Sequence, residues 1–178
     1  ILTSGPTGSG KTTTLYAILN EINQRSHKII TLEDPIEYRL DGINQIQVNP
    51  SIGLNFSNLL RSVLRQDPDI IMVGEIRDAE TARLATQAAL TGHLVISSLH
   101  TNTALGAVTR LIDMGIEPFL ISAALKGVIG QRLIKKLCTS CRRERKATPS
   151  ETVAFGLTQD EIIASSQGCS TCHQTGYN

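Results

Sequence analysis

An octapeptide near the start of the chain, GPTGSGKT at residues 5–12, has the glycine, lysine and threonine spacing of a phosphate-binding loop. Its glycines allow backbone N–H groups to turn toward phosphate oxygens without a Cβ in the way. In such a loop Lys11 neutralises β- and γ-phosphate charge, and the Thr12 hydroxyl binds Mg²⁺. A glycine-rich turn that matches by chance is the alternative. The segment predicts that ATP is bound by Gly5, Pro6, Thr7, Gly8, Ser9, Gly10, Lys11, Thr12 and Thr13.

Two acidic sites follow apolar segments, and hydrolysis of a nucleotide needs a base and a group that orients water. Glu33 comes after the apolar run 29–32, and Glu75 comes after 70–73 and Gly74. In open α/β sheets ligands lie beyond the carboxyl ends of the strands, so both carboxylates should face the phosphates. Gly74 stands where a Mg²⁺-binding Asp often sits, so the sequence leaves open which acid serves the metal and which is the base. The alternative for each is an N-cap or surface acid.

Two histidines, His93 and His100, bracket the apolar run 94–99. They are seven residues apart and cannot both lie at one end of a strand. His100 is at the carboxyl end, near the expected phosphates, and is the stronger catalytic candidate by position. A lone histidine is more often structural, and this alternative applies to His93 above all.

All four cysteines lie in two CxxC pairs, Cys138 with Cys141 and Cys169 with Cys172, separated by 27 residues. Two such pairs match a tetrahedral site with four thiolate ligands, and four thiolates leave no open position for water. The pattern predicts one structural Zn²⁺; four reduced thiols are the alternative. In the loop between the pairs, Thr158 and Glu161 form a possible capping box for a helix at 158–164.

Hydrophobic periodicity predicts that strands and helices alternate along the chain. Such alternation is typical of an α/β fold with a mainly parallel sheet covered on both faces. We expect strands at 1–4, 28–32, 43–48, 69–73 and 94–99, and helices at 11–24, 56–65, 79–90, 104–114 and 118–133.

The composition narrows the classes of function. A net charge of +1 among 178 residues, 3% aromatic residues and no Trp disfavour a nucleic-acid-binding protein. No segment is long and apolar enough to span a bilayer, and the chain opens on no secretory signal. We therefore expect a cytosolic, reducing compartment, where cysteines bind metals or stay free.

A change in composition near Arg132 divides the chain, because a basic segment and all the cysteines follow it. We expect an ATPase core at 1–132 and a small zinc-binding subdomain at 133–178. The apolar run at 1–3 reads as the end of a buried strand, and no terminating helix closes the other end. We therefore expect a piece of a longer protein, with an N-terminal domain and a C-terminal tail missing.

The motifs together resemble one family, the secretion superfamily ATPases that drive type II secretion and type IV pilus assembly. Across residues 1–137 the motifs match the family in both sequence and order. The two CxxC pairs extend the resemblance to residue 178. Residues 102–111 and 113–119 favour the type II secretion member, with the pilus-assembly member second. The motifs of this chain that carry the resemblance are GPTGSGKT at 5–12, TLEDPIEY at 31–38, LRQDPD at 64–69, VGEIRD at 73–78, and TGHL to LHTN at 91–102.

This resemblance implies a RecA-like domain that works as a homohexamer, with ATP between protomers. It implies that Glu33 and Glu75 belong to the family's Asp box and Walker B, and that His93 and His100 both belong to its His box. It also implies trans-acting arginines from an N-terminal domain. Finally, it implies docking, through protein contacts, to an inner-membrane secretion or pilus platform at the cytoplasmic face.

Two rival functions come from other classes. A P-loop kinase would need an acceptor pocket and a lid, and no arginine-rich lid is evident in the sequence. A nucleic-acid translocase could use the basic residues beside the cysteines, although a solvated face is the simpler interpretation of that segment.

Overall fold

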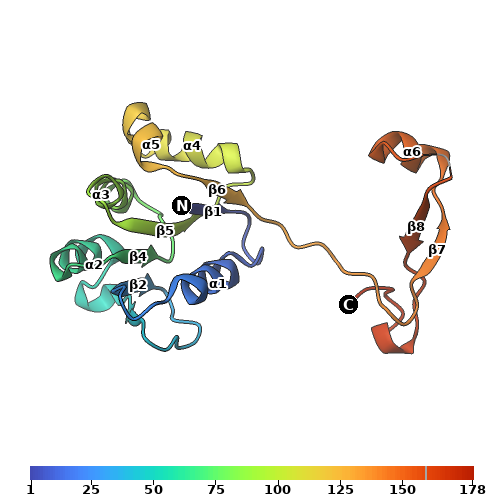
Figure 1. The fold of residues 1–178 in the computed structure, drawn as a ribbon, viewed down its shortest axis with the longest axis horizontal. Helices are drawn as coiled ribbons and strands as arrows, with labels where there is room; N and C mark the ends of the chain where they lie inside the picture. Colours follow the sequence, from blue (N-terminus) through green and yellow to red (C-terminus); the bar gives the residue numbers. More distant parts are fainter. Residues whose placement is uncertain (159) are drawn as a thin grey trace. The chain divides into compact units, whose positions relative to one another are not determined.

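The computed structural model describes residues 1–158 and 160–178, which form two compact units, Ile1–Leu133 and Ile134–Asn178. The first unit is built on a six-stranded sheet in the order β3-β2-β4-β5-β1-β6, in which every pairing is parallel (Figure 1). The predicted α/β fold with a mainly parallel sheet is confirmed. Its elements are β1 Leu2–Ser4, α1 Lys11–Ile22, β2 Ile29–Glu33, β3 Asn44–Gln47, α2 Phe56–Val63, β4 Ile70–Val73, α3 Ala79–Leu90, β5 Leu94–Leu99, α4 Ala104–Asp113, α5 Pro118–Ala124 and β6 Val128–Gly130, with 3₁₀ turns at Pro50–Ile52 and Leu64–Gln66.

The central strands are buried on both faces, and their side chains alternate between two apolar clusters. On one side, Ile30 and Ile71 pack with residues of α2, α3, α4 and α5. On the other, Ile29 and Ile70 pack with Leu15 and other residues of α1. The register pairs Ile29 with Ile70 and Ile30 with Ile71, so each cluster receives matching residues from neighbouring strands. This packing holds α1, and the loop before it, against the middle of the sheet.

The predicted helix at 118–133 is wrong in its second half. Helix α5 ends at Ala124, and Val128–Gly130 forms the edge strand β6, parallel to β1. Glycines at 127 and 130 disfavour a helix, and β-branched residues at 128 and 129 favour a strand. Pairing with a distant segment also favours the strand, because β6 supplies hydrogen bonds to the side of β1 that does not face β5. The Leu2 N–H, for example, donates to the Gly127 carbonyl at 3.0 Å.

The second unit contains a two-stranded antiparallel sheet, formed by β7 Arg143–Lys146 and β8 Ile162–Ser165. The predicted helix at 158–164 is therefore wrong, because its last part is strand; residue 159 lies outside the described residues. The Thr158 N–H does donate to Glu161 Oε2, at 3.1 Å, but this contact precedes a strand rather than a helix. The helix of this unit lies earlier, as α6 Pro149–Phe155, and a short 3₁₀ turn spans Ser170–Cys172.

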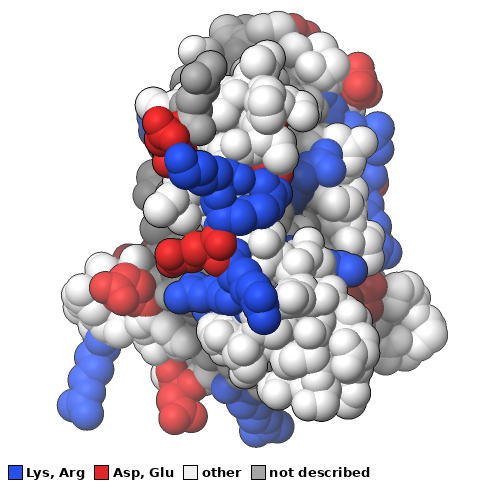
Figure 2. Space-filling view, turned by 90° about the vertical axis from the view of Figure 1, so that its right-hand side faces the viewer, with Lys and Arg blue, Asp and Glu red and all other residues white. Residues whose placement is uncertain are grey.

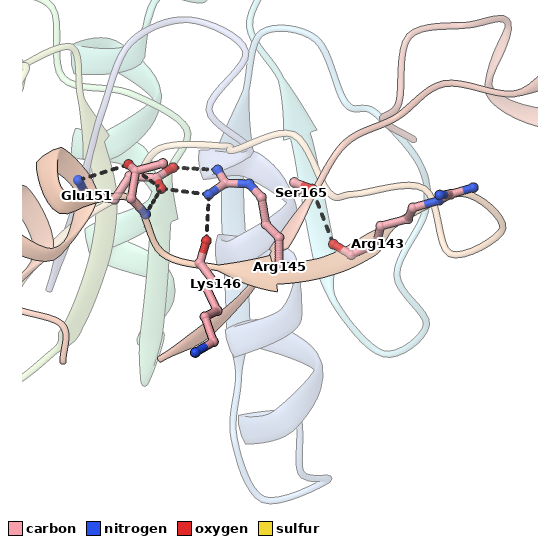
Figure 3. Close-up of polar contacts among 6 residues, drawn as sticks. Arg143, Arg145, Lys146, Glu151 and Ser165 are labelled. Atoms are coloured by element: carbon pink, nitrogen blue, oxygen red, sulfur yellow. Dashed lines mark hydrogen bonds and ion pairs between the residues drawn. The ribbon is translucent and has the colours of Figure 1, made fainter. Parts of the chain in front are cut away.

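Ion pairs partly neutralise the basic segment of the second unit. On the face drawn in Figure 2, acidic side chains lie among the lysines and arginines. The Arg145 guanidinium donates two hydrogen bonds to Glu151, at 2.8 and 2.6 Å, and these tie β7 to the start of α6 (Figure 3). Hydrogen bonds from Arg145, and then from Thr148, hold the pKa of Glu151 well below its usual range. Lys146 pairs with Asp160 at 2.8 Å. The segment is thus not an unbroken basic surface.

None of the helices that the structure describes is long and apolar enough to cross a bilayer.

Candidate nucleotide and metal sites

The phosphate-binding segment forms the turn between β1 and α1, at the carboxyl end of the sheet. Gly8 and Gly10 have φ angles of 76° and 83°, in the left-handed region that favours glycine. Gly5 is required for a second reason, since a Cβ there would lie 2.3 Å from the Gln131 carbonyl oxygen. Gly10 also precedes the first turn of α1, whose N–H groups are free of intrahelical partners. The turn therefore presents backbone donors at a helix start, as an anion site requires.

The side chain of Lys11 extends back to the start of this turn. Its Nζ donates to the carbonyls of Gly5 at 2.9 Å and Pro6 at 3.0 Å, and the residue is buried. Burial lowers the pKa of Lys11, and the charge of Glu75 opposes that shift. The ammonium group is thus already positioned at the loop, within the electrostatic influence of Glu75.

A cavity of about 610 Å³ opens in front of the loop, within the size range of small-molecule sites. Its lining comes from the loop, from the ends of β2, β4 and β5, and from α1. Among the predicted site residues, the lining includes Thr7, Gly8, Gly10, Lys11, Thr12, Thr13, Glu33, Glu75 and His100.

Glu33, the last residue of β2, is 2% exposed and its carboxylate is fully engaged. It accepts hydrogen bonds from the Tyr16 hydroxyl, from the Thr31 hydroxyl at 2.6 Å, and from Gln45 Nε2 at 3.0 Å. Burial, and then the bond to Glu33, raise the pKa of Tyr16 to about 12. The sequence analysis missed Tyr16 and Gln45. A Tyr four residues after Thr12 on the buried face of α1 was the available signal, since a buried phenol needs a partner.

Glu75 follows β4 and is held more loosely. Its side chain is 12% exposed, with the Arg77 guanidinium on Oε1 and His100 Nε2 3.3 Å from Oε2. The bond to Glu75 raises the pKa of Arg77. Despite its closeness to His100, Oε2 is buried and accepts no well-aligned hydrogen bond from any described residue. A buried carboxylate oxygen with an unused lone pair is suited to receive a proton or bind water.

Gly74, which takes the place of the expected acid, lies close to the backbone of β2. A Cβ at Gly74 would lie 3.1 Å from the Leu32 carbonyl oxygen, and the Gly74 N–H donates to that same carbonyl at 2.8 Å. The Ser98 hydroxyl donates to the Gly74 carbonyl at 2.8 Å. This backbone is therefore fixed between β2 and β5, and Glu75 is the first side chain that can enter the cavity.

The structure separates the two histidines. His100 follows β5 and lines the cavity beside Glu75. His93 lies before β5, at the opposite edge of the sheet, where its Nδ1 is 3.0 Å from the Ala88 carbonyl. That contact caps the last turn of α3, which is a structural role within this chain.

The four cysteine sulfurs of the second unit converge, with all four within 4.8 Å of one another. The Cys138–Cys169, Cys141–Cys172 and Cys169–Cys172 sulfur pairs are 4.0, 3.8 and 3.7 Å apart. A tetrahedron with metal–sulfur bonds of about 2.3 Å has sulfur–sulfur edges of about 3.8 Å, so the cluster has the size of a four-thiolate site. Backbone N–H groups of Cys169 and Gly176 both donate to the Cys172 sulfur at 3.2 Å, which favours its thiolate. The cluster could hold one metal ion.

The sequence of the chain matches a known family. The whole chain, residues 1–178, matches the family described as Type II/IV secretion system protein. The chain belongs to this family. The resemblance inferred from the motifs is thereby confirmed.

Relatives with sequence similarity to this chain are named as secretion proteins. The chain is 58% identical to Type II secretion system protein E of Aeromonas hydrophila and 56% identical to Type II secretion system ATPase E of Vibrio cholerae serotype O1. Each match covers 99% of this chain and 36% of the relative. The chain thus spans about a third of the length of these relatives.

Solved structures of family members have the same fold. The pilus retraction motor PilT with bound ADP matches 78% of this chain and 43% of its own, with 45% identity and a TM-score of 0.71. The VirB11 ATPase of the Brucella suis type IV secretion system, in complex with sulphate, matches 72% of this chain and 43% of its own, with 29% identity and a TM-score of 0.62.

Tyr16→Phe should remove the buried phenol bond to Glu33 and destabilise the fold by about 1–3 kcal/mol, measured by urea unfolding at neutral pH. Tyr38→Phe is the control, because its ring packs against Tyr16 at 4.7 Å but the residue is 54% exposed.

The pKa of Tyr16 is raised, so its neutral form contributes stability below pH 10 that is lost as the pH rises toward 12. Ultraviolet titration should find one tyrosine ionising near 12, absent from Tyr16→Phe. Ionisation of every tyrosine near pH 10 in the folded protein would contradict this.

Proposed function

We propose that this chain is the ATP-hydrolysing part of a motor that powers pseudopilus assembly, and hence protein export, in a type II secretion system. The observation that carries the proposal is one cavity that joins the phosphate-binding turn to Glu33, Glu75 and His100. The names of its relatives support it: a Type II secretion system ATPase E and a pilus retraction motor with bound ADP. Pilus assembly is the second choice within the same mechanism.

In this mechanism the turn and Lys11 bind the β- and γ-phosphates, and Thr12 and one of the acids would hold Mg²⁺. The bound Mg²⁺ would supply further positive charge at the phosphates. Glu75 accepts a proton from the attacking water at Oε2, which has acceptor capacity left. Glu33, whose carboxylate is fixed by three donors, would orient the attacking water or help to hold Mg²⁺. His100 lines the cavity beside the proposed base, with its Nε2 3.3 Å from Glu75 Oε2.

We infer that other parts of the natural full-length protein complete this site, since the chain spans about a third of its relatives. On this proposal the protein is a homohexamer, and an N-terminal domain supplies arginines across the protomer boundary. His93, which lies away from the cavity, would then act as a structural residue or at a protomer contact. The assembly would work at the cytoplasmic face of the inner membrane, bound to platform proteins.

The second unit is proposed to hold one structural Zn²⁺ through Cys138, Cys141, Cys169 and Cys172. The size of the sulfur cluster supports four-thiolate coordination. The only buried residues of this unit among those described are Cys138, Ala147, Cys172 and Gly176, so it has almost no apolar core of its own. Metal binding would then supply much of its folding free energy.

Two rivals predict different products or activators. A kinase would transfer phosphate to an acceptor, so release of inorganic phosphate without an acceptor excludes it. A nucleic-acid translocase would be stimulated by DNA or RNA. The ion pairs of Arg145 and Lys146 within the basic segment weigh against that reading.

Lys11→Ala should abolish hydrolysis and weaken ATP binding, because it removes the side-chain cation that lies at the turn. Phosphate release and nucleotide affinity should be measured on the full-length protein. Lys126→Ala, on an exposed lysine far from the turn in sequence, is the control. Normal turnover by Lys11→Ala would remove the basis of the proposal.

Glu75→Gln should bind ATP with near-normal affinity but hydrolyse it at least about 100-fold more slowly, since the amide cannot accept a proton. Single-turnover phosphate release, with ATP affinity measured in parallel, separates the two effects. Glu80→Gln, an exposed acid on α3, is the control. Loss of ATP binding with an unchanged rate per bound site would instead assign Glu75 to nucleotide binding.

Cys169→Ser should lower the zinc content below one ion per chain and loosen the second unit, while ATP binding persists because the first unit has its own core. Elemental analysis and limited proteolysis of protein purified without chelator are the measurements. Ser170→Ala, the adjacent exposed residue, is the matched control. Wild-type protein that contains no zinc when its thiols are reduced would leave four ordinary thiols.

A further inference from the structure

We propose that Gln131 is a positioning residue that sets the direction of a phosphate-binding amide in the turn, a role that rests on the nucleotide function proposed above. Gln131 follows the edge strand β6, more than a hundred residues after the turn, and no motif of the sequence analysis includes it. Parallel pairing of β6 with β1 brings it there (Figure 1).

The Gln131 side chain bridges the turn and the helix that follows it. Its Nε2 donates to the Ser9 carbonyl at 2.8 Å, and its Oε1 accepts from the Thr14 hydroxyl, on α1, at 2.7 Å. The Gln131 backbone contributes as well, since its N–H donates to the Ser4 carbonyl at 2.7 Å. One residue thus contacts the strand before the turn, the turn itself and the helix after it.

The bond to Ser9 has a consequence for the next amide. In a trans peptide the C=O of one residue and the N–H of the next point in opposite directions, because the unit is planar. With the Ser9 carbonyl held by Gln131, the Gly10 N–H points to the other side of the peptide. Gly10 lines the cavity, and on this side its N–H would be available to donate to a bound phosphate.

Two close approaches make this arrangement specific. A Cβ at Gly10 would lie 2.9 Å from Gln131 Nε2, and a Cβ at Gly5 would lie 2.3 Å from the Gln131 carbonyl oxygen. Two glycines of the turn therefore make room for Gln131 as well as for phosphate. A larger residue at either position would push Gln131 away from Ser9.

The test compares two changes that each remove one arm of the bridge. Gln131→Glu keeps an oxygen for Thr14 but replaces the donor to Ser9 by a carboxylate, which repels the carbonyl. Thr14→Val removes the other arm and leaves the bond to Ser9. Arg132→Ala is the control at the neighbouring position, an exposed residue whose guanidinium donates to the Asn102 carbonyl at 3.2 Å.

In full-length protein, displacement of a fluorescent ATP analogue should measure affinities for ADP and for adenosine, which lacks phosphate. Gln131→Met, which removes the donor without adding a charge, should weaken ADP binding about tenfold, the effect of one lost orienting bond, and leave adenosine binding unchanged. Gln131→Glu should lose at least as much ADP affinity, because its carboxylate also repels the phosphates. Thr14→Val should lose less ADP affinity, and Arg132→Ala none.

A merely structural brace would give a different result: equal losses for ADP and adenosine, or a lower unfolding temperature with unchanged affinity. Either result, or normal ADP binding by Gln131→Met, overturns the proposal. If Gln131→Glu does not fold, Gln131→Met, which is of similar length without a donor, still tests the ADP-specific loss. Wild-type protein that binds no ADP would instead refute the proposed function itself.

Discussion

Parallel strand pairing is the constraint on which the candidate site depends. Because all strands of the sheet run the same way, their carboxyl ends meet at one edge. The chain leaves β1 into the phosphate-binding turn, β2 ends at Glu33, and β4 and β5 lead into Glu75 and His100. Groups from separate segments of the sequence therefore converge without any long loop having to place them. The two apolar clusters on the faces of the sheet hold this register, and a one-residue slip of β2 would take Glu33 out of the cavity.

The two carboxylates at this edge differ in how far the protein satisfies them. Glu33 has three donors and little freedom, whereas Glu75 keeps one buried oxygen without a well-aligned partner. A fully bonded carboxylate is suited to holding a geometry, and a partly bonded one is suited to exchanging a proton. The difference supports the proposed division of roles, with Glu75 as the base, which the sequence alone left open.

Features that depend on local spacing were predictable, and features that depend on contacts between distant segments were not. The turn, most of the strands and the cysteine pairs are each indicated by a pattern of a few consecutive residues. Strand β6 was misread as helix because its formation depends on β1, at the other end of the unit. Tyr16, Gln45 and Gln131 escaped notice for the same reason, since their roles arise from partners 17, 12 and 122 residues away. Position along the chain did separate His100 from His93, because strand length alone puts them at opposite edges.

The nearly coreless second unit has a consequence for how the protein is made. If the four cysteines bind zinc as proposed, Cys138 and Cys141 leave the ribosome before Cys169 and Cys172, and the site cannot form until all four are present. Synthesis at roughly 5–20 residues per second gives an interval of seconds, during which the first pair of thiols is unprotected. The first unit can fold in that time, since all of its strands have already been made. The supply of zinc would then limit the folding of the second unit, after the first unit has formed.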